Sequence, residues 1–160
     1  MYIITINKRF VGYPVVRHDI SEEIDIVHET IQSNIKSKYS EYNLICTGTS
    51  GLYIATMLKA RAPKMYHVCY MGKHGEQAHR GQIIDSADGN LGAPSIFIDD
   101  FVESGSTMDH ACELWNGHVS RMKMKLTKVR YAVLLGTQSK SALVEACERN
   151  KIKFLIHFES

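Results

Sequence analysis

Apolar runs that alternate with helical segments are the feature that most limits the fold of this 160-residue chain. Short runs typical of buried strands recur at 44–46, 65–71, 95–98, 129–135 and 152–158. Segments predicted to be helical lie between them, at 52–60, 106–115 and 139–150. Strands joined by crossover helices run parallel, and the crossover is nearly always right-handed. The sequence therefore predicts a doubly wound α/β fold, with a mainly parallel sheet and helices on both faces.

The N-terminal part is predicted to form a small addition before this core. Short strands are expected at 2–7 and 12–17, followed by a helix that begins at Ser21, a good N-cap residue. The apolar face of this helix is expected to consist of Ile24, Val27, Ile31 and Ile35. We predict one domain, with the addition or partial hood at 1–43 and the core at 44–160.

Composition argues against several classes of protein. Hydrophobic residues make up 44% and charged residues 22%, as in an ordinary globular domain, and the formal net charge is only +2. This balance favours neither bulk nucleic-acid binding nor attachment to a membrane surface. No stretch is long enough to span a bilayer or to act as a secretory signal, so we expect a cytosolic protein. The four cysteines lie far apart and are expected to be reduced and mostly buried.

Segment 96–107 has the strongest chemical signal. An apolar strand ends in Asp99 and Asp100, and a helix follows after a short turn. Ligands of open parallel sheets bind at the carboxyl ends of strands, and a helix N-terminus directs backbone N–H groups at an anion. Gly105 allows the backbone to approach a phosphate closely. Hydroxyl donors are expected from Ser104, Ser106 and Thr107. The pattern suits a sugar phosphate, although the two acids alone could also form a plain Mg²⁺ site or a solvated turn.

The same segment resembles the motif with which type I phosphoribosyltransferases bind 5-phosphoribosyl-1-pyrophosphate (PRPP). It matches at every position: an apolar strand, two acids, two apolar residues, a variable pair, glycine, any residue and threonine. The resemblance implies that the 5′-phosphate is bound by Ser104, Gly105, Ser106 and Thr107. It implies that Asp99 and Asp100 bind the ribose hydroxyls and Mg²⁺. Glu103 lies where several purine-using members have an acid that is a proposed general acid/base, whereas other members have none.

The turn at 48–51 resembles, by its position, the loop that binds pyrophosphate in this family. Its expected contacts are Thr49, Ser50 and Gly51, through backbone and hydroxyl donors. Many members of the family place a lysine or arginine in this loop, and this chain does not. The alternative interpretation is a simple connection between a strand and a helix.

Residues 72–94 form a long polar stretch, which we interpret as an active-site lid rather than a plain disordered loop. The run Lys73-His74-Gly75-Glu76 resembles the mobile loop of orotate phosphoribosyltransferases, without their full basic cluster. Cations on a closing lid would stabilise the charge that develops on the departing pyrophosphate, so Lys73 and His74 are predicted to be catalytic. A solvated charged loop is the alternative, and a zinc site from His74 and His79 lacks suitably spaced partners.

These resemblances imply transfer of the 5-phosphoribosyl group from PRPP to a nucleobase, with Mg²⁺ as cofactor and a homodimer as the usual assembly. We expect a pyrimidine such as orotate as the first choice of acceptor and a 6-oxopurine as the second. Anionic orotate needs a cation or several backbone N–H groups, and the N-terminal candidates for the cation are Lys8, Arg9 and Arg17. A purine would favour a stacking partner such as Tyr13, Tyr53 or Phe101.

Two other functions stay open. Regulators that keep this fold bind RNA or DNA and sense PRPP or nucleotides without catalysis. The basic run at 121–130 would suit such a regulator, although a solvated helix end is the more ordinary interpretation. A different sugar-phosphate enzyme, such as a PRPP-forming synthetase, is the other possibility, but synthetases of this kind are normally longer than this chain. We expect neither nucleic acid nor a membrane as the main partner.

Overall fold

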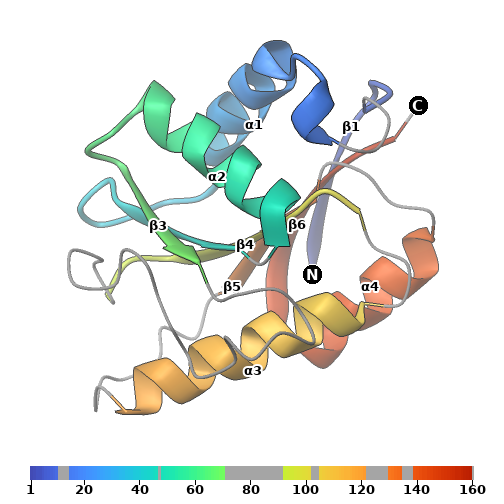
Figure 1. Ribbon diagram of the computed structural model, residues 1–160. Helices are drawn as coiled ribbons and strands as arrows, with labels where there is room; N and C mark the ends of the chain where they lie inside the picture. Colours follow the sequence, from blue (N-terminus) through green and yellow to red (C-terminus); the bar gives the residue numbers. More distant parts are fainter. Residues whose placement is uncertain are drawn as a thin grey trace.

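The computed structural model describes residues 1–10, 15–46, 48–70, 92–101, 105–121, 130–134 and 139–159. Within these ranges, parallel strands form one six-stranded sheet in the order β1-β6-β5-β4-β2-β3 (Figure 1). The strands are β1 (Tyr2–Ile6), β2 (Tyr42–Cys46), β3 (Tyr66–Tyr70), β4 (Ser95–Asp99), β5 (Arg130–Leu134) and β6 (Ile152–Phe158). The predicted parallel sheet is confirmed, and β1 extends it at one edge by pairing with β6.

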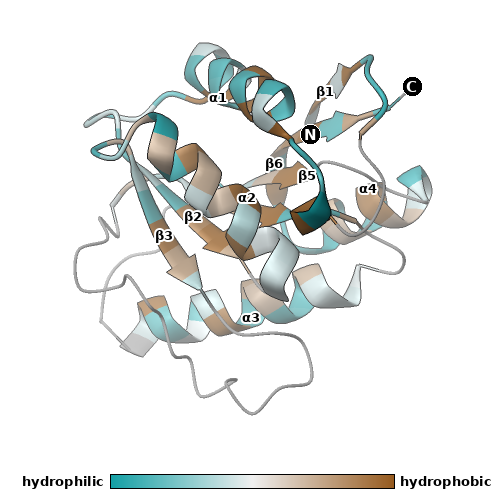
Figure 2. Ribbon diagram, turned by 45° about the horizontal axis from the view of Figure 1, so that its top comes forward, coloured by the Kyte–Doolittle hydropathy of each residue, from teal (hydrophilic) through white to brown (hydrophobic). Residues whose placement is uncertain are grey.

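Helices cover both faces of the sheet, as predicted. They are the short 3₁₀ helix η1 (Val15–Arg17), α1 (Ser21–Asn34), α2 (Gly48–Arg61), α3 (Ser106–Arg121) and α4 (Lys140–Arg149). Figure 1 shows α1 and α2 on one face and α3 and α4 on the other. Side chains of a strand point alternately to the two faces, so Ile96 and Ile98 pack toward α1 and α2, whereas Phe97 packs toward α3 and α4. Figure 2 shows the apolar strands between these two helical layers.

The chain reverses its direction of winding between β2 and β4. From β2 it proceeds through α2 to the edge strand β3, and from β4 it proceeds the other way through α3, β5 and α4 to β6. β2 and β4 are neighbours, with Cys46 at the end of β2 opposite Ile98. Right-handed crossovers in opposite directions place α2 and α3 on opposite faces. This topology leaves a switch point at the carboxyl ends of β2 and β4, the usual ligand position in open α/β sheets.

Two predictions for the N-terminal segment are wrong. Residues 15–17 form η1 instead of the end of a strand at 12–17, whose first residues lie outside the described ranges. The helix does begin at Ser21, but Ser21 does not cap it. The Asp19 carboxylate accepts hydrogen bonds from the Ser21 N–H (3.0 Å) and hydroxyl (2.6 Å), and these bonds lower the pKa of Asp19. A carboxylate two residues upstream therefore supplies the acceptor, which the sequence pattern did not reveal.

The cysteine prediction is confirmed, because all four cysteines are reduced and buried. Burial raises the pKa of Cys46, Cys112 and Cys147 to about 12, so these three thiols stay protonated at neutral pH and are poor nucleophiles. Across the described ranges, no helix is long and apolar enough to cross a membrane.

Candidate functional site

Asp99 and Asp100 lie at the carboxyl end of β4, at the switch point of the sheet. Asp99 is opposite Leu134 of β5. It lies two residues after Phe97 on the strand, so its side chain points to the same face, that of α3 and α4. Asp100 is only 8% exposed, and its backbone N–H donates to Asp99 Oδ1 at 2.8 Å. Burial, reinforced by the neighbouring Asp100, raises the pKa of Asp99 to about 8. A cation bound beside this buried carboxyl group would stabilise its ionised form.

The first turn of α3 follows this acidic pair after residues 102–104, which lie outside the described ranges. Gly105 is buried, and its φ of +85° lies in the left-handed region that favours glycine. The Gly105 carbonyl accepts the first helical hydrogen bond, from the Asp109 N–H at 3.0 Å. Ser106 is exposed and Thr107 is half-buried in this turn. A helix start of this kind, with two hydroxyl side chains, is where the sequence predicts an anion site.

Gly105 also has a structural role that the sequence pattern did not reveal. A Cβ atom at this position would lie 2.6 Å from the Cβ of Ala146 on α4. The contact is with the body of a neighbouring helix, so it cannot be relieved by moving a flexible side chain. The first turn of α3 therefore packs directly on α4. This packing alone requires glycine at position 105, whether or not a phosphate binds there.

A polar clamp holds the same turn in place. Asp109 accepts hydrogen bonds from Arg149 Nε (3.1 Å), Arg149 Nη2 (2.8 Å) and Asn150 Nδ2 (2.6 Å). Burial opposes ionisation of Asp109, but these hydrogen bonds outweigh it and lower the pKa of the carboxyl. Since Arg149 and Asn150 end α4, the clamp joins the start of α3 to the end of α4. The two partners are forty residues apart in the sequence, so no local signal could have predicted this contact.

The first turn of α2 lies on the other side of the switch point. The sequence predicts a separate turn at 48–51, but the structure includes these residues in the helix, which begins at Gly48 with a φ of +70°. Among the described residues, a Cβ on Gly48 would meet no atom within 4 Å, so they leave the space beside it open. A Cβ on Gly51 would lie 3.0 Å from the Ile98 carbonyl oxygen. This turn therefore abuts the end of β4, with Thr49 exposed and Ser50 half-buried.

The structure thus brings together most of the predicted binding residues that it describes. The Asp99–Asp100 pair, the turn containing Thr49, Ser50 and Gly51, and the start of α3 surround the switch point. The remaining predicted residues lie outside the described ranges: Lys73, His74, Glu103 and Ser104. Within those ranges, no group of three or more His, Cys, Asp or Glu side chains is arranged to hold a metal ion.

The N-terminal cations proposed for an anionic base have different surroundings. Lys8 Nζ lies 3.0 Å from a carboxylate oxygen of both Glu22 and Glu23, and these two hydrogen bonds raise the pKa of Lys8. Glu23 is only 5% exposed, and its second oxygen, Oε2, is buried without a partner. Arg9 and Arg17 are exposed. Lys8 is therefore already neutralised within the protein, which the local sequence did not indicate.

Solved structures similar to this chain are phosphoribosyltransferases. An orotate phosphoribosyltransferase from Aeropyrum pernix has a TM-score of 0.58 at 18% identity, covering 93% of this chain and 78% of that one. An adenine phosphoribosyltransferase from Saccharomyces cerevisiae has a TM-score of 0.55 at 15% identity, covering 90% and 81%. A purine phosphoribosyltransferase from Pyrococcus horikoshii has a TM-score of 0.51 at 12% identity, covering 100% and 90%. The chain has the phosphoribosyltransferase fold.

Sequence comparison adds nothing to this likeness. No family model matches the chain, and curated protein sequences give no significant match. At the identities above, the likeness establishes the phosphoribosyltransferase fold alone. The similar structures carry the names of orotate, adenine and purine enzymes, so they do not single out one base.

Proposed function

We propose that this protein transfers the 5-phosphoribosyl group from PRPP to a nitrogenous base and releases pyrophosphate. The observation that supports this most is the position of the PRPP-like motif. Asp99 ends β4 at the switch point, Asp100 follows it, and Gly105 precedes α3 at a left-handed φ. A second helix start, that of α2, abuts the same strand end through Gly51. Two anion-binding helix starts beside an acidic pair match a substrate with phosphate groups at both ends of a ribose.

The parts of PRPP are assigned as follows. The 5′-phosphate binds at the start of α3, through Ser104, Gly105, Ser106 and Thr107. Asp99 and Asp100 hold the ribose hydroxyls. Pyrophosphate binds at the start of α2, through Thr49, Ser50 and Gly51. Fixing both ends of the substrate positions C1′ for attack and keeps the leaving group in a defined place.

Mg²⁺ fits the acidic pair. Carboxylate oxygens are its preferred protein ligands, and burial raises the pKa of Asp99, so a cation beside the pair would stabilise the ionised carboxylate. Asp99 and Asp100 are the residues that would hold the ion. When bound, Mg²⁺ neutralises charge on the pyrophosphate and the ribose oxygens.

The reaction replaces one bond at C1′ by another. The bond between C1′ and the pyrophosphate oxygen breaks, and pyrophosphate leaves with the electron pair. A ring nitrogen of the base donates its lone pair to C1′, which has oxocarbenium character in the transition state. Lys73 and His74 would stabilise the charge on the leaving group. Glu103 would exchange a proton with the base, if the acceptor is a purine.

The acceptor is proposed to be a pyrimidine such as orotate, with a 6-oxopurine as the second choice. The two hydrogen bonds from Lys8 to Glu22 and Glu23 make Lys8 a poor partner for the orotate carboxylate, which leaves Arg9 and Arg17 as the N-terminal candidates. Phe101 is half-buried directly after the acidic pair, where it could stack on a base. We further propose a cytosolic homodimer.

A base panel tests the proposal. Orotate, uracil, hypoxanthine, guanine, xanthine and adenine are each incubated with PRPP and Mg²⁺, and nucleotide and pyrophosphate are quantified. Formation of orotidine monophosphate is expected, and it should be lost in the Asp99→Asn/Asp100→Asn double variant. Turnover of a purine alone would move the assignment to the second choice. Binding of PRPP without turnover of any base would favour a non-catalytic regulator instead.

A further inference from the structure

The proposed pyrophosphate site lacks a cation on the turn that forms it. Its turn reads Gly48-Thr49-Ser50-Gly51 and contains no cationic side chain. Pyrophosphate carries several negative charges, and neutral donors alone bind such groups less strongly than charge-assisted ones do. Since the inference below concerns this site, it rests on the proposed function.

The short helix η1 lies against α2, which begins with this turn. Val15 of η1 is 2% exposed and belongs to the apolar core that α2 covers. The His18 N–H donates to the Val15 carbonyl at 3.0 Å. The Tyr53 hydroxyl of α2 donates to the His18 carbonyl at 3.4 Å. These contacts fix the backbone on both sides of Arg17 beside the N-terminal half of α2.

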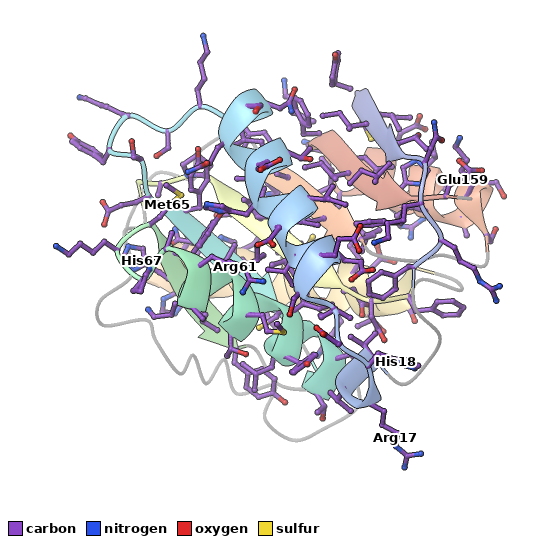
Figure 3. The ribbon with its side chains drawn as sticks, turned by 90° about the horizontal axis from the view of Figure 1, so that it is seen from above. Arg17, His18, Arg61, Met65, His67 and Glu159 are labelled. Atoms are coloured by element: carbon purple, nitrogen blue, oxygen red, sulfur yellow. The ribbon has the colours of Figure 1, made fainter. Side chains whose placement is uncertain are left out.

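The Arg17 side chain is not used within the described part of the protein. It is exposed, and it forms no ion pair or side-chain hydrogen bond with any described residue. Figure 3 shows Arg17 and His18 beside the N-terminal end of α2, with the Arg17 side chain directed away from the body of the protein.

Two other cations near α1 and α2 are already paired. Arg61, at the other end of α2, binds the Asp25 carboxylate and donates to the Ser21 carbonyl at 3.0 Å. Lys8 is held by Glu22 and Glu23. Arg17 differs from both, because no acid in the described ranges neutralises it and its backbone is anchored next to the helix start that lacks a cation.

We propose that Arg17 binds the pyrophosphate group of PRPP and supplies the positive charge that the turn at 48–51 lacks. A guanidinium group can form two parallel hydrogen bonds to phosphate oxygens, which makes it well suited to this contact. Its long stem lets the charged head extend from η1 over the adjoining end of α2. The N-terminal segment thereby contributes to leaving-group binding as well as to the covering of the core.

The experiment compares three probes by calorimetry in the presence of Mg²⁺: pyrophosphate, PRPP and ribose 5-phosphate. The Arg17→Gln variant is expected to bind pyrophosphate and PRPP roughly tenfold more weakly or worse, because one charge-assisted contact is lost. Ribose 5-phosphate lacks the pyrophosphate group, so its affinity should not change. Arg17→Lys should recover part of the loss, since it restores the charge without the planar fork.

Lys36→Gln is the matched control for net charge. Lys36 is exposed in the connection between the C-terminal end of α1 and the start of β2, and its removal also deletes one positive charge. This variant should bind all three probes as the unmodified protein does. If it loses as much pyrophosphate affinity as Arg17→Gln, the effect is one of overall charge and the proposal fails.

The remaining outcomes separate this inference from the proposed function. If the unmodified protein binds neither PRPP nor pyrophosphate, the proposed function itself is wrong. If it binds both, and Arg17→Gln binds pyrophosphate unchanged, only the assignment of Arg17 is wrong. An equal loss of affinity for all three probes would also overturn the assignment. Ribose 5-phosphate has no pyrophosphate group, so loss of a contact to that group cannot weaken its binding.

Discussion

The starts of α2 and α3 face the same switch point, yet their glycines have opposite surroundings. Gly48 begins α2 at a φ of +70° with open space where a Cβ would lie. Gly105 precedes α3 at a φ of +85°, and a Cβ there would lie 2.6 Å from Ala146. Both glycines thus have a positive φ, but Gly48 leaves room for a ligand at the start of α2, whereas Gly105 allows the start of α3 to contact α4. The start of α3 is fixed to its neighbour, whereas the start of α2 is accessible.

The largest expected effect is a difference in the free energy of unfolding that is lost when each glycine is replaced by alanine. Alanine at Gly48 should cost about 1–2 kcal/mol, because only the left-handed conformation is unfavourable. Gly105→Ala should cost about 2–5 kcal/mol, because overpacking against α4 adds to the same conformational cost. Urea unfolding of both variants measures the difference.

A double variant identifies the origin of that difference. Ala146→Gly removes the atom that the new Cβ would meet, so Gly105→Ala/Ala146→Gly should recover part of the lost stability, beyond the sum of the single effects. Equal costs for Gly48→Ala and Gly105→Ala, without coupling to Ala146, would remove the distinction between the two turns.

Features of the fold that depend on neighbouring residues in the sequence could be predicted, whereas contacts between distant residues could not. The last strand was predicted at 152–158 and is observed there, because its apolar residues and flanking turn residues are a local signal. The start of α3 at Ser106 was predicted equally well. The contact of Gly105 with Ala146 could not be predicted, since it depends on how α3 crosses α4. The strand expected at 12–17 failed for a related reason: Val15 is buried against α2, and tertiary packing overrides a weak strand propensity.

The acidic pair between the two turns gives the next effect. The pKa of Asp99 is about 8 in the folded protein, against an ordinary value of 3.8. Between these values the folded protein holds a proton that the unfolded chain has released, so stability should fall as pH rises from about 4 to 8. Asp99→Asn removes this dependence and should make the unliganded protein about 1–3 kcal/mol more stable at pH 8. Melting curves from pH 5 to 8 measure it, and a variant as pH-dependent as the parent would contradict it.

Asp109 should behave in the opposite way, because its clamp favours the ionised carboxylate. Its pKa is lowered in the folded protein, so the stability it contributes is present at neutral pH and is lost as pH falls toward the lowered pKa. Asp109→Asn should cost about 1 kcal/mol or less at pH 7, since the ion pair with Arg149 is partly exposed. Chemical unfolding at pH 7 and at pH 3 checks the sign: the gap between variant and parent should narrow at the lower pH.

The smallest change in stability is expected at the accessible turn, where it should accompany a change in binding. Thr49 is exposed, so Thr49→Val should alter stability by less than about 0.5 kcal/mol. If its hydroxyl binds pyrophosphate, affinity for pyrophosphate should fall a few-fold while affinity for ribose 5-phosphate stays unchanged. Thr107→Val, at the start of α3, is the matched change and should show the reverse preference.

Calorimetry of both variants with both probes would show whether the two helix starts divide the substrate between them. If each variant weakens binding of a different probe, α2 holds the leaving group and α3 holds the phosphate that stays with the ribose. If both variants weaken binding of the same probe, the two turns contact one phosphate group together. The accessible turn and the packed turn would then belong to a single anion site, and the assignment of pyrophosphate to α2 would be wrong.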